Sequence, residues 1–155
     1  MRRRVVPLAR RLHQVCTAAV AEVLDGEEIN ALEYGALAWL QDDPDIDQNA
    51  LAARMGIDRT TASVLASSLE LRGFVDRLTN PKDRRARVLR LTETGRALRE
   101  RLRPRVRDCQ DRILSGLAPA EQATLLDLLV RVVTTTEAYN RPGAGRRKPL
   151  RTSAP

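Results

Sequence analysis

The segment FVDRLTNPKDRRARVLRLTETG, residues 74–95, constrains the fold more than any other part of the chain. Apolar and charged residues alternate on both sides of its centre, as they do along the half-buried strands of a hairpin. Asn80 and Pro81 supply turn chemistry between the two strands. A charged tip follows, made of Lys82, Asp83, Arg84 and Arg85. The segment therefore predicts a small β-wing with a cationic tip.

Two short helices are expected directly before this wing. Asp47 is placed to cap a helix over QNALAARM that ends at Gly56, and Asp58 to cap a second helix that ends at Gly73. A helix-turn-helix needs small residues where its helices touch, a glycine at the turn and apolar anchors on its second helix. Those requirements are met by Ala52, Gly56, Ala62 and Leu65. The pattern predicts a winged helix-turn-helix, a fold typical of double-stranded DNA binding.

The second of these helices would present polar side chains on its outer, N-terminal part. The candidates for contacts with base edges in a major groove are Arg59, Thr60, Thr61, Ser63, Val64 and Ser67. The alternative is a solvated polar helix face. The wing that follows at once favours the DNA interpretation.

The wing supplies a second set of candidate DNA contacts. Its cations are expected to reach phosphates or a minor groove, while Asp83 pairs with an arginine and holds the loop in shape. These cations are Arg77, Lys82, Arg84, Arg85 and Arg87. Charges on a hairpin can also merely suppress edge pairing. Five net positive charges between Arg72 and Arg90 argue against that alternative.

The charge of +7 is unevenly distributed over the 155 residues. Residues 17–71 sum to −9 and residues 72–105 to +8, so one side of the protein is expected to face a polyanion. Cys16 and Cys109 occupy apolar helical positions and offer neither a disulfide framework nor zinc spacing. The arginine-rich start lacks the apolar run of a signal peptide, and no run approaches the ~20 apolar residues of a membrane span. We expect a cytoplasmic protein with no membrane partner, no metal and no cofactor.

Helical periodicity dominates the rest of the chain, so the fold class is mainly α with a small β-wing. Apolar residues from Leu8 to Val23 predict a first helix between about Pro7 and Gly26. Asn30 and Glu33 have the spacing of a capping box that opens a second helix. A long helix is expected from Leu98, and a last one from about Pro119 to Tyr139.

Residues 47–95 resemble the MarR family of bacterial transcriptional regulators. The similarity lies in Leu51, Ala52, the DRTTAS run from Asp58 to Ser63, Leu69, Gly73, Val75, the Asp83, Arg84, Arg85 tip, Leu91, Thr92 and Gly95. Many family members carry a basic residue at the positions of Val64 and Ser68. Because this recognition helix is nearly neutral, the wing and the terminal arms are expected to supply more of the affinity for phosphates.

The resemblance implies a homodimer on a pseudo-palindromic operator. It divides the chain into an N-terminal dimerisation helix with a basic start (1–29), the DNA-binding domain (30–95), C-terminal dimerisation helices (96–140) and a disordered basic tail (141–155). It further implies a repressor that releases DNA when a small, commonly phenolic, ligand binds between the two layers. Arg10, His13, Tyr34 and Trp39 are the candidates to hold an aromatic acid; alternatively they are ordinary core and interface residues.

Three other functions fit parts of the sequence less well. Some family members sense organic hydroperoxides through a first-helix cysteine, which raises a thiol-sensor alternative for Cys16, although it sits mid-helix among apolar residues. A winged helix can also bind DNA without sequence preference. An enzyme is disfavoured because the sequence has one histidine, no phosphate-binding glycine loop and no nucleophile motif, so no catalytic residue is assigned.

Overall fold

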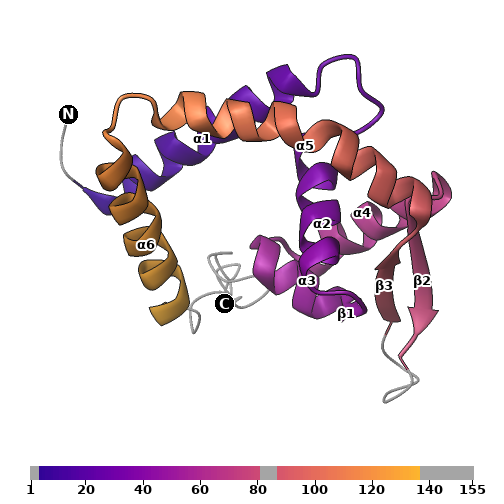
Figure 1. Ribbon diagram of the computed structural model, residues 1–155. Coiled ribbons are helices and arrows are strands. Elements are labelled where there is room, and N and C mark those ends of the chain that lie inside the picture. The colour runs from indigo at the N-terminus through magenta and orange to yellow at the C-terminus, as the bar shows by residue number, and fades with distance from the viewer. Residues whose placement is uncertain (1–3, 81–86, 137–155) are drawn as a thin grey trace, which may run out of the picture.

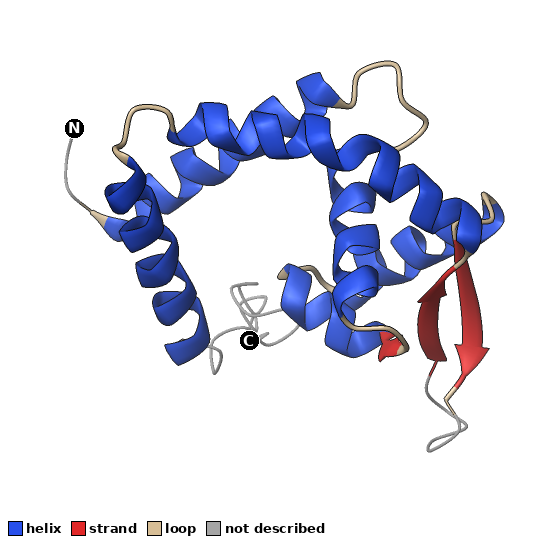
Figure 2. Ribbon diagram, in the orientation of Figure 1, coloured by secondary structure: helices blue, strands red, loops and turns tan. Residues whose placement is uncertain are grey.

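The computed structural model describes residues 4–80 and 87–136, and it shows a helical protein with one small sheet (Figures 1 and 2). Helices α1 (Val5–Val23) and α5 (Glu93–Leu114) lie side by side (Figure 1). Helix α6 (Pro119–Thr135) lies at the opposite end of the molecule from the wing (Figure 1). Between α1 and α5, the chain forms α2 (Ala31–Asp42), β1 (Ile46–Asp47), α3 (Gln48–Met55), α4 (Arg59–Leu71), β2 (Val75–Thr79) and β3 (Arg87–Leu91). These elements confirm the expected fold class.

Side-chain caps set where the central helices begin, as the sequence predicts. The Asn30 side chain accepts from the Glu33 amide and the Glu33 carboxylate accepts from the Asn30 amide, both at 3.0 Å, which completes the capping box of α2. Asp47 and Asp58 cap α3 and α4. Helix α1 begins at Val5 and ends at Val23, slightly earlier at both ends than expected. The basic tail expected over residues 141–155 lies outside the described residues.

The sheet has three strands rather than the two expected. Its order is β1-β3-β2, and all neighbours are antiparallel. Val75 pairs with Leu91, and both are buried; Arg77 and Ile46 flank buried Leu89 on either side. The sequence does not reveal β1 because two residues are too few to show an alternating pattern, and Asp47 already has a role as a helix cap.

The core forms around α2 and joins the winged helix to α5. Its most completely buried large side chains include Leu37 and Leu40 of α2, Leu69 of α4, Leu89 of β3 and Leu102 of α5. Burial of such side chains stabilises the fold by roughly 1.5–3 kcal/mol each. The helix-turn-helix and the wing are therefore anchored on the same core as the first half of α5.

Helices α1 and α6, in contrast, bury no residue in the single chain. The apolar side chains of the expected helical stripes are only partly covered: Leu8 and Val15 of α1 are 38% and 48% exposed and Val132 of α6 is 54% exposed, while Val20 and Val23 pack half-buried against the core. Within residues 4–80 and 87–136, no single helix is both long and apolar enough to span a membrane; α5 and α6 pass that test only jointly, across a bend of 102°.

A tight junction connects the wing to α5. The Thr92 amide donates to the Phe74 carbonyl at 3.1 Å, and the Thr92 hydroxyl donates to the Gly73 carbonyl at 2.7 Å. The same hydroxyl accepts from the Gly95 amide, which caps α5. A Cβ at position 95 would lie 2.1 Å from the Phe74 oxygen, so only glycine fits there.

We expect Gly95→Ala to destabilise the protein by about 1–3 kcal/mol, the usual cost of forcing an extra carbon into a packed site. This loss of stability should appear although alanine forms helices more readily than glycine. Chemical denaturation at one fixed protein concentration measures it. Gly116→Ala is the control, because a Cβ there meets no atom within 4 Å. Equal stability of the two variants would contradict the close contact.

Asp45 provides a pH-dependent test of how β3 is attached to the loop before β1. Arg90 Nε and Nη2 donate to its two carboxylate oxygens at 2.7 and 2.6 Å, and these bonds lower the pKa of Asp45. Because its pKa is lowered, the Asp45 carboxylate stabilises the folded state fully at pH values above about 4, the ordinary pKa of aspartate. This stabilisation is lost as pH falls below that value and through the lowered pKa. The pair is exposed, so the effect should stay under about 1 kcal/mol.

Asp45→Asn isolates the charge, because asparagine also tolerates the positive φ of 64° at this position. The free energies of unfolding of variant and wild type should differ at pH 6, and the difference should be smaller at pH 3. A difference of the same size at both pH values would show that the ion pair is not its source.

Candidate nucleic-acid interface

The helix-turn-helix holds α4 rigidly, and the contacts are those expected. Ala52, Ala62 and Leu65 are 1%, 3% and 5% exposed, and Gly56 has a φ of 65°, which lets α3 end and the chain turn. The Asp58 carboxylate accepts from the Thr61 amide at 2.9 Å and fixes the first turn of α4.

The opposite face of α4 is open to solvent. Its exposed residues are Arg59, Thr60, Ser63, Val64 and Ser67, whereas Thr61 is half-buried. Val64 is 66% exposed, which is high for an apolar side chain that packs on nothing in the chain's core. This face therefore presents hydroxyls, one guanidinium and one branched apolar group, the chemistry suited to base edges and thymine methyl groups.

The wing strands differ from expectation in what their arginines contact. Arg77 Nη2 donates to Ser67 Oγ at 3.1 Å, and Arg77 Nε lies 3.5 Å from a carboxylate oxygen of Glu70. Arg87 Nη1 donates to Thr79 Oγ1 at 2.6 Å, across the β2–β3 pair. Both guanidinium groups are thus engaged within the protein, and Arg77 ties the wing to α4. Lys82, Asp83, Arg84 and Arg85 lie outside the described residues.

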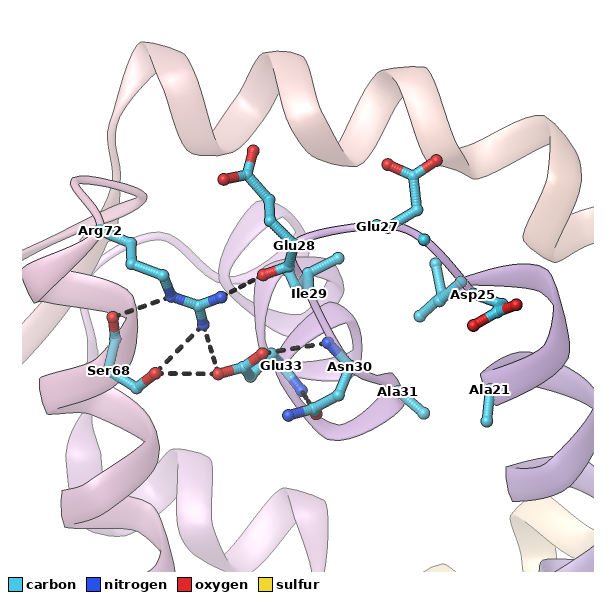
Figure 3. Close-up of a pocket in the computed structure, with 12 residues that line it drawn as sticks. Ala21, Asp25, Glu27, Glu28, Ile29, Asn30, Ala31, Glu33, Ser68 and Arg72 are labelled. Carbon is cyan, nitrogen blue, oxygen red and sulfur yellow. Dashed lines mark hydrogen bonds and ion pairs between the residues drawn. The ribbon is translucent and has the colours of Figure 1, made fainter.

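Two further arginines of the basic segment pair with acidic residues that precede the helix-turn-helix. Arg90 binds Asp45, and Arg72 reaches from the end of α4 to Glu33 and to the Glu28 carbonyl (Figure 3). A count of charges along the sequence includes these cations among those available to DNA. Their partners lie 45 and 39 residues away, so no local pattern could reveal the pairing.

A surface cavity of about 670 Å³ lies beside this arginine (Figure 3). It is lined by the α1–α2 connection, residues 24–30, together with residues that include Ala31, Glu33, Ser68 and Arg72. None of the four candidate effector residues lines this cavity. Arg10 and His13 are exposed on α1, and Trp39 is 39% exposed with the Arg54 guanidinium 5.5 Å from its ring centroid.

Tyr34, the fourth candidate, is buried within the core, and burial raises its pKa. The charges of Arg99, Glu100 and Arg103 on α5 also act on this phenol. Among the described residues, no group of three or more histidine, cysteine, aspartate or glutamate side chains is arranged to hold a metal ion. Cys109 is buried in the core and Cys16 is half-buried; both are free thiols.

Comparison with known proteins shows the family. A model of the MarR family matches residues 28–86. The chain is 33% identical over 99 residues to the protein described as the putative transcriptional regulatory protein for the hcr operon in Thauera aromatica. This match covers 64% of the chain and 60% of that relative, so the chain spans less than two thirds of its length.

Two solved structures extend the similarity over most of the chain. The PcaV transcriptional regulator from Streptomyces coelicolor, in complex with its natural ligand, is 34% identical with a TM-score of 0.70, and the match covers 83% of this chain and 91% of PcaV. A cysteine-to-serine mutant of MarR from E. coli, complexed with operator DNA, is 28% identical with a TM-score of 0.72, over 83% and 94% of the two chains. This chain belongs to the MarR family: it is a winged helix-turn-helix transcriptional regulator and not an enzyme.

Proposed function

We propose that this regulator is a homodimeric repressor that binds a pseudo-palindromic operator and leaves it when a small aromatic acid binds. The observation that carries the proposal is the exposed polar face of α4, held rigidly by α3 and flanked by the wing. The MarR–operator structure supports it, because that related protein binds DNA with the same fold.

In this proposal α4 selects the sequence and the wing supplies most of the affinity. Helix α4 offers one guanidinium, that of Arg59, which limits its attraction for phosphates. Since Arg77 and Arg87 already bond within the protein, the cations of the tip carry the phosphate or minor-groove contacts. Those residues are Lys82, Arg84 and Arg85, with Asp83 as their scaffold.

Dimerisation explains the exposed apolar surface of α1 and α6. Contiguous apolar surface of this kind marks a protein interface. On α6 the exposed fractions run from 39% at Leu129 to 63% at Val130, and a groove of about 410 Å³ at the start of the helix is lined by residues that include Leu117, Leu125 and Leu128. A second copy of the chain covering this face would place two recognition helices about 10 base pairs apart, one for each half-site.

The effector hypothesis rests on the family and on four side chains. PcaV has been solved in complex with its natural ligand, so a related protein with this fold binds a ligand. We assign Arg10 to the carboxylate of an aromatic acid and Tyr34, Trp39 and His13 to its ring and hydroxyl groups. A ligand between the dimer layer and the winged helices would change the separation of the two copies of α4 and misplace one from its half-site.

The wing and α4 should respond differently to substitution. Arg84→Ala or Arg85→Ala should weaken binding to all duplexes and reduce the slope of log K against log salt by about 0.9 for each lost phosphate contact. Ser63→Ala or Thr61→Ala should mainly lower the preference for the operator over a point-changed duplex. Fluorescence anisotropy at several salt concentrations measures both quantities. Arg107→Ala, at an exposed arginine of α5, is the matched control. Normal binding by Arg85→Ala would exclude the wing contact.

Substitution on α6 tests the dimer. Val132→Glu places a carboxylate on the apolar face and should convert the protein to monomers, because burying an unpaired charge is costly. Arg131→Glu also introduces a glutamate, but on the polar side of the helix, which carries Thr124 and Asp127. This variant should leave the dimer intact. Analytical ultracentrifugation measures the oligomeric state of both variants. A wild-type chain that sediments as a monomer would refute the proposal directly.

Release from DNA tests the effector. Small phenolic acids should displace the protein from its operator, and His13→Ala should abolish or weaken that response without changing DNA affinity in the absence of ligand. If none of the acids acts, or if His13→Ala responds like wild type, the assigned site is wrong. Treatment with an organic hydroperoxide tests the thiol-sensor alternative. That alternative requires the peroxide to release the wild-type protein from DNA and not to release Cys16→Ser.

A further inference from the structure

The C-terminal end of α4 is held by a buried carboxylate on α2. Glu33 is 7% exposed, and among the described parts of the chain it is the one charged residue that is buried. Its Oε1 atom accepts from Arg72 Nη2 and, at 3.0 Å, from the Ser68 hydroxyl (Figure 3). Its Oε2 atom accepts from the Asn30 amide at 3.0 Å. One carboxylate therefore caps the start of α2 and anchors the end of the recognition helix.

Several protein groups bind the Arg72 side chain, which is 29% exposed. Besides Glu33, its guanidinium donates to the Glu28 carbonyl and, from Nε and Nη2, to the Ser68 carbonyl and hydroxyl at 3.2 and 3.1 Å. The Phe74 ring lies under it, 5.4 Å from Cζ to the centroid. A planar guanidinium with several bonds of this kind holds one orientation, which a lysine could not reproduce.

The α1–α2 connection, residues 24–30, receives a second set of arginines from α5. Glu27 accepts from Arg101 Nη2 at 2.8 Å and from Arg105 Nη1, and these bonds lower the pKa of Glu27. Arg105 also donates to the Val23 carbonyl. The connection is thus bonded to α5 through Glu27 and to α4 through the Glu28 carbonyl, so it links the long helix to the recognition helix.

We propose that Arg72 is a positioning residue for DNA recognition. It does not contact DNA; through Glu33 and the Glu28 carbonyl it fixes the C-terminal end of α4 against α2 and the α1–α2 connection, and thereby sets how α4 enters the groove. The inference rests on the proposed DNA-binding function. Arg72 is then not among the cations that face phosphates, although its position in the basic segment suggests a phosphate contact.

The single variants Glu33→Gln and Arg72→Gln and the double variant test the proposal. Their affinity for the operator is measured at several salt concentrations. Each variant should weaken binding by about tenfold with an unchanged salt slope, and the double variant should be no weaker than the weaker single variant, because both remove one interaction. If Arg72 were a phosphate contact, Arg72→Gln would lower the slope by about 0.9, and Glu33→Gln, which removes a negative charge, would leave binding equal or tighter. Either of those results overturns the proposal.

Asp25→Asn is the matched control, because it makes the same carboxylate-to-amide change at an exposed position that lines the same cavity. It should bind operator like wild type. Glu33→Gln keeps an acceptor for the Asn30 amide, so this variant retains the α2 cap, and circular dichroism verifies its fold. Weakening by Asp25→Asn equal to that by Glu33→Gln would show a general charge effect and contradict the positioning role.

Hydrogen exchange without DNA separates this proposal from the proposed function. Amides near the end of α4, residues 66–73, should exchange faster in Glu33→Gln and Arg72→Gln than in wild type or Asp25→Asn. If the wild-type chain shows no operator preference while this exchange pattern holds, the proposed function fails and the Arg72 contact remains. If exchange is unchanged in both variants, Arg72 does not hold α4 and the inference fails.

Discussion

The close contact between Gly95 and the Phe74 carbonyl sets the geometry on which the DNA-binding surface depends. The absence of a side chain at position 95 lets α5 begin directly against the end of the segment that links α4 to β2. The Thr92 hydroxyl joins the same point to the Gly73 carbonyl. Recognition helix, wing and α5 therefore meet at one junction, so the wing cannot change direction independently of α4.

Ion pairs then decide which cations remain for DNA. The four described arginines between residues 72 and 90 all bond to protein groups: Arg72 to Glu33, Arg77 to Ser67 and Glu70, Arg87 to Thr79 and Arg90 to Asp45. These side chains stiffen the scaffold instead of serving simply as a basic surface. The nearly neutral α4 fits the proposed division of roles, in which its hydroxyls and Val64 select bases and attract phosphates little.

The sequence predicted what depends on local chemistry. Asn30, Asp47 and Asp58 mark helix starts because each cap forms within three residues, and Val75 and Arg77, at alternate positions of one strand, indicated β2. The Arg72–Glu33 pair was not predictable, because its two residues are 39 positions apart in the sequence and are brought together only by the fold. Strand β1 was too short to show a period. The apolar stripes of α1 and α6 predicted packing, but only the family resemblance assigned these helices to a dimer layer, since periodicity does not say whether the covering surface belongs to the same chain.

The central claim is that a rigid, nearly neutral α4 selects sequence while the wing supplies affinity. The most direct measurement compares the affinity of the wild-type chain for a palindrome upstream of its own gene with that for a scrambled duplex of equal length and composition, across a range of salt. We predict that both affinities fall steeply with salt while the palindrome stays preferred by about 10³-fold or more. Equal affinity for the two duplexes at every salt concentration would contradict the account.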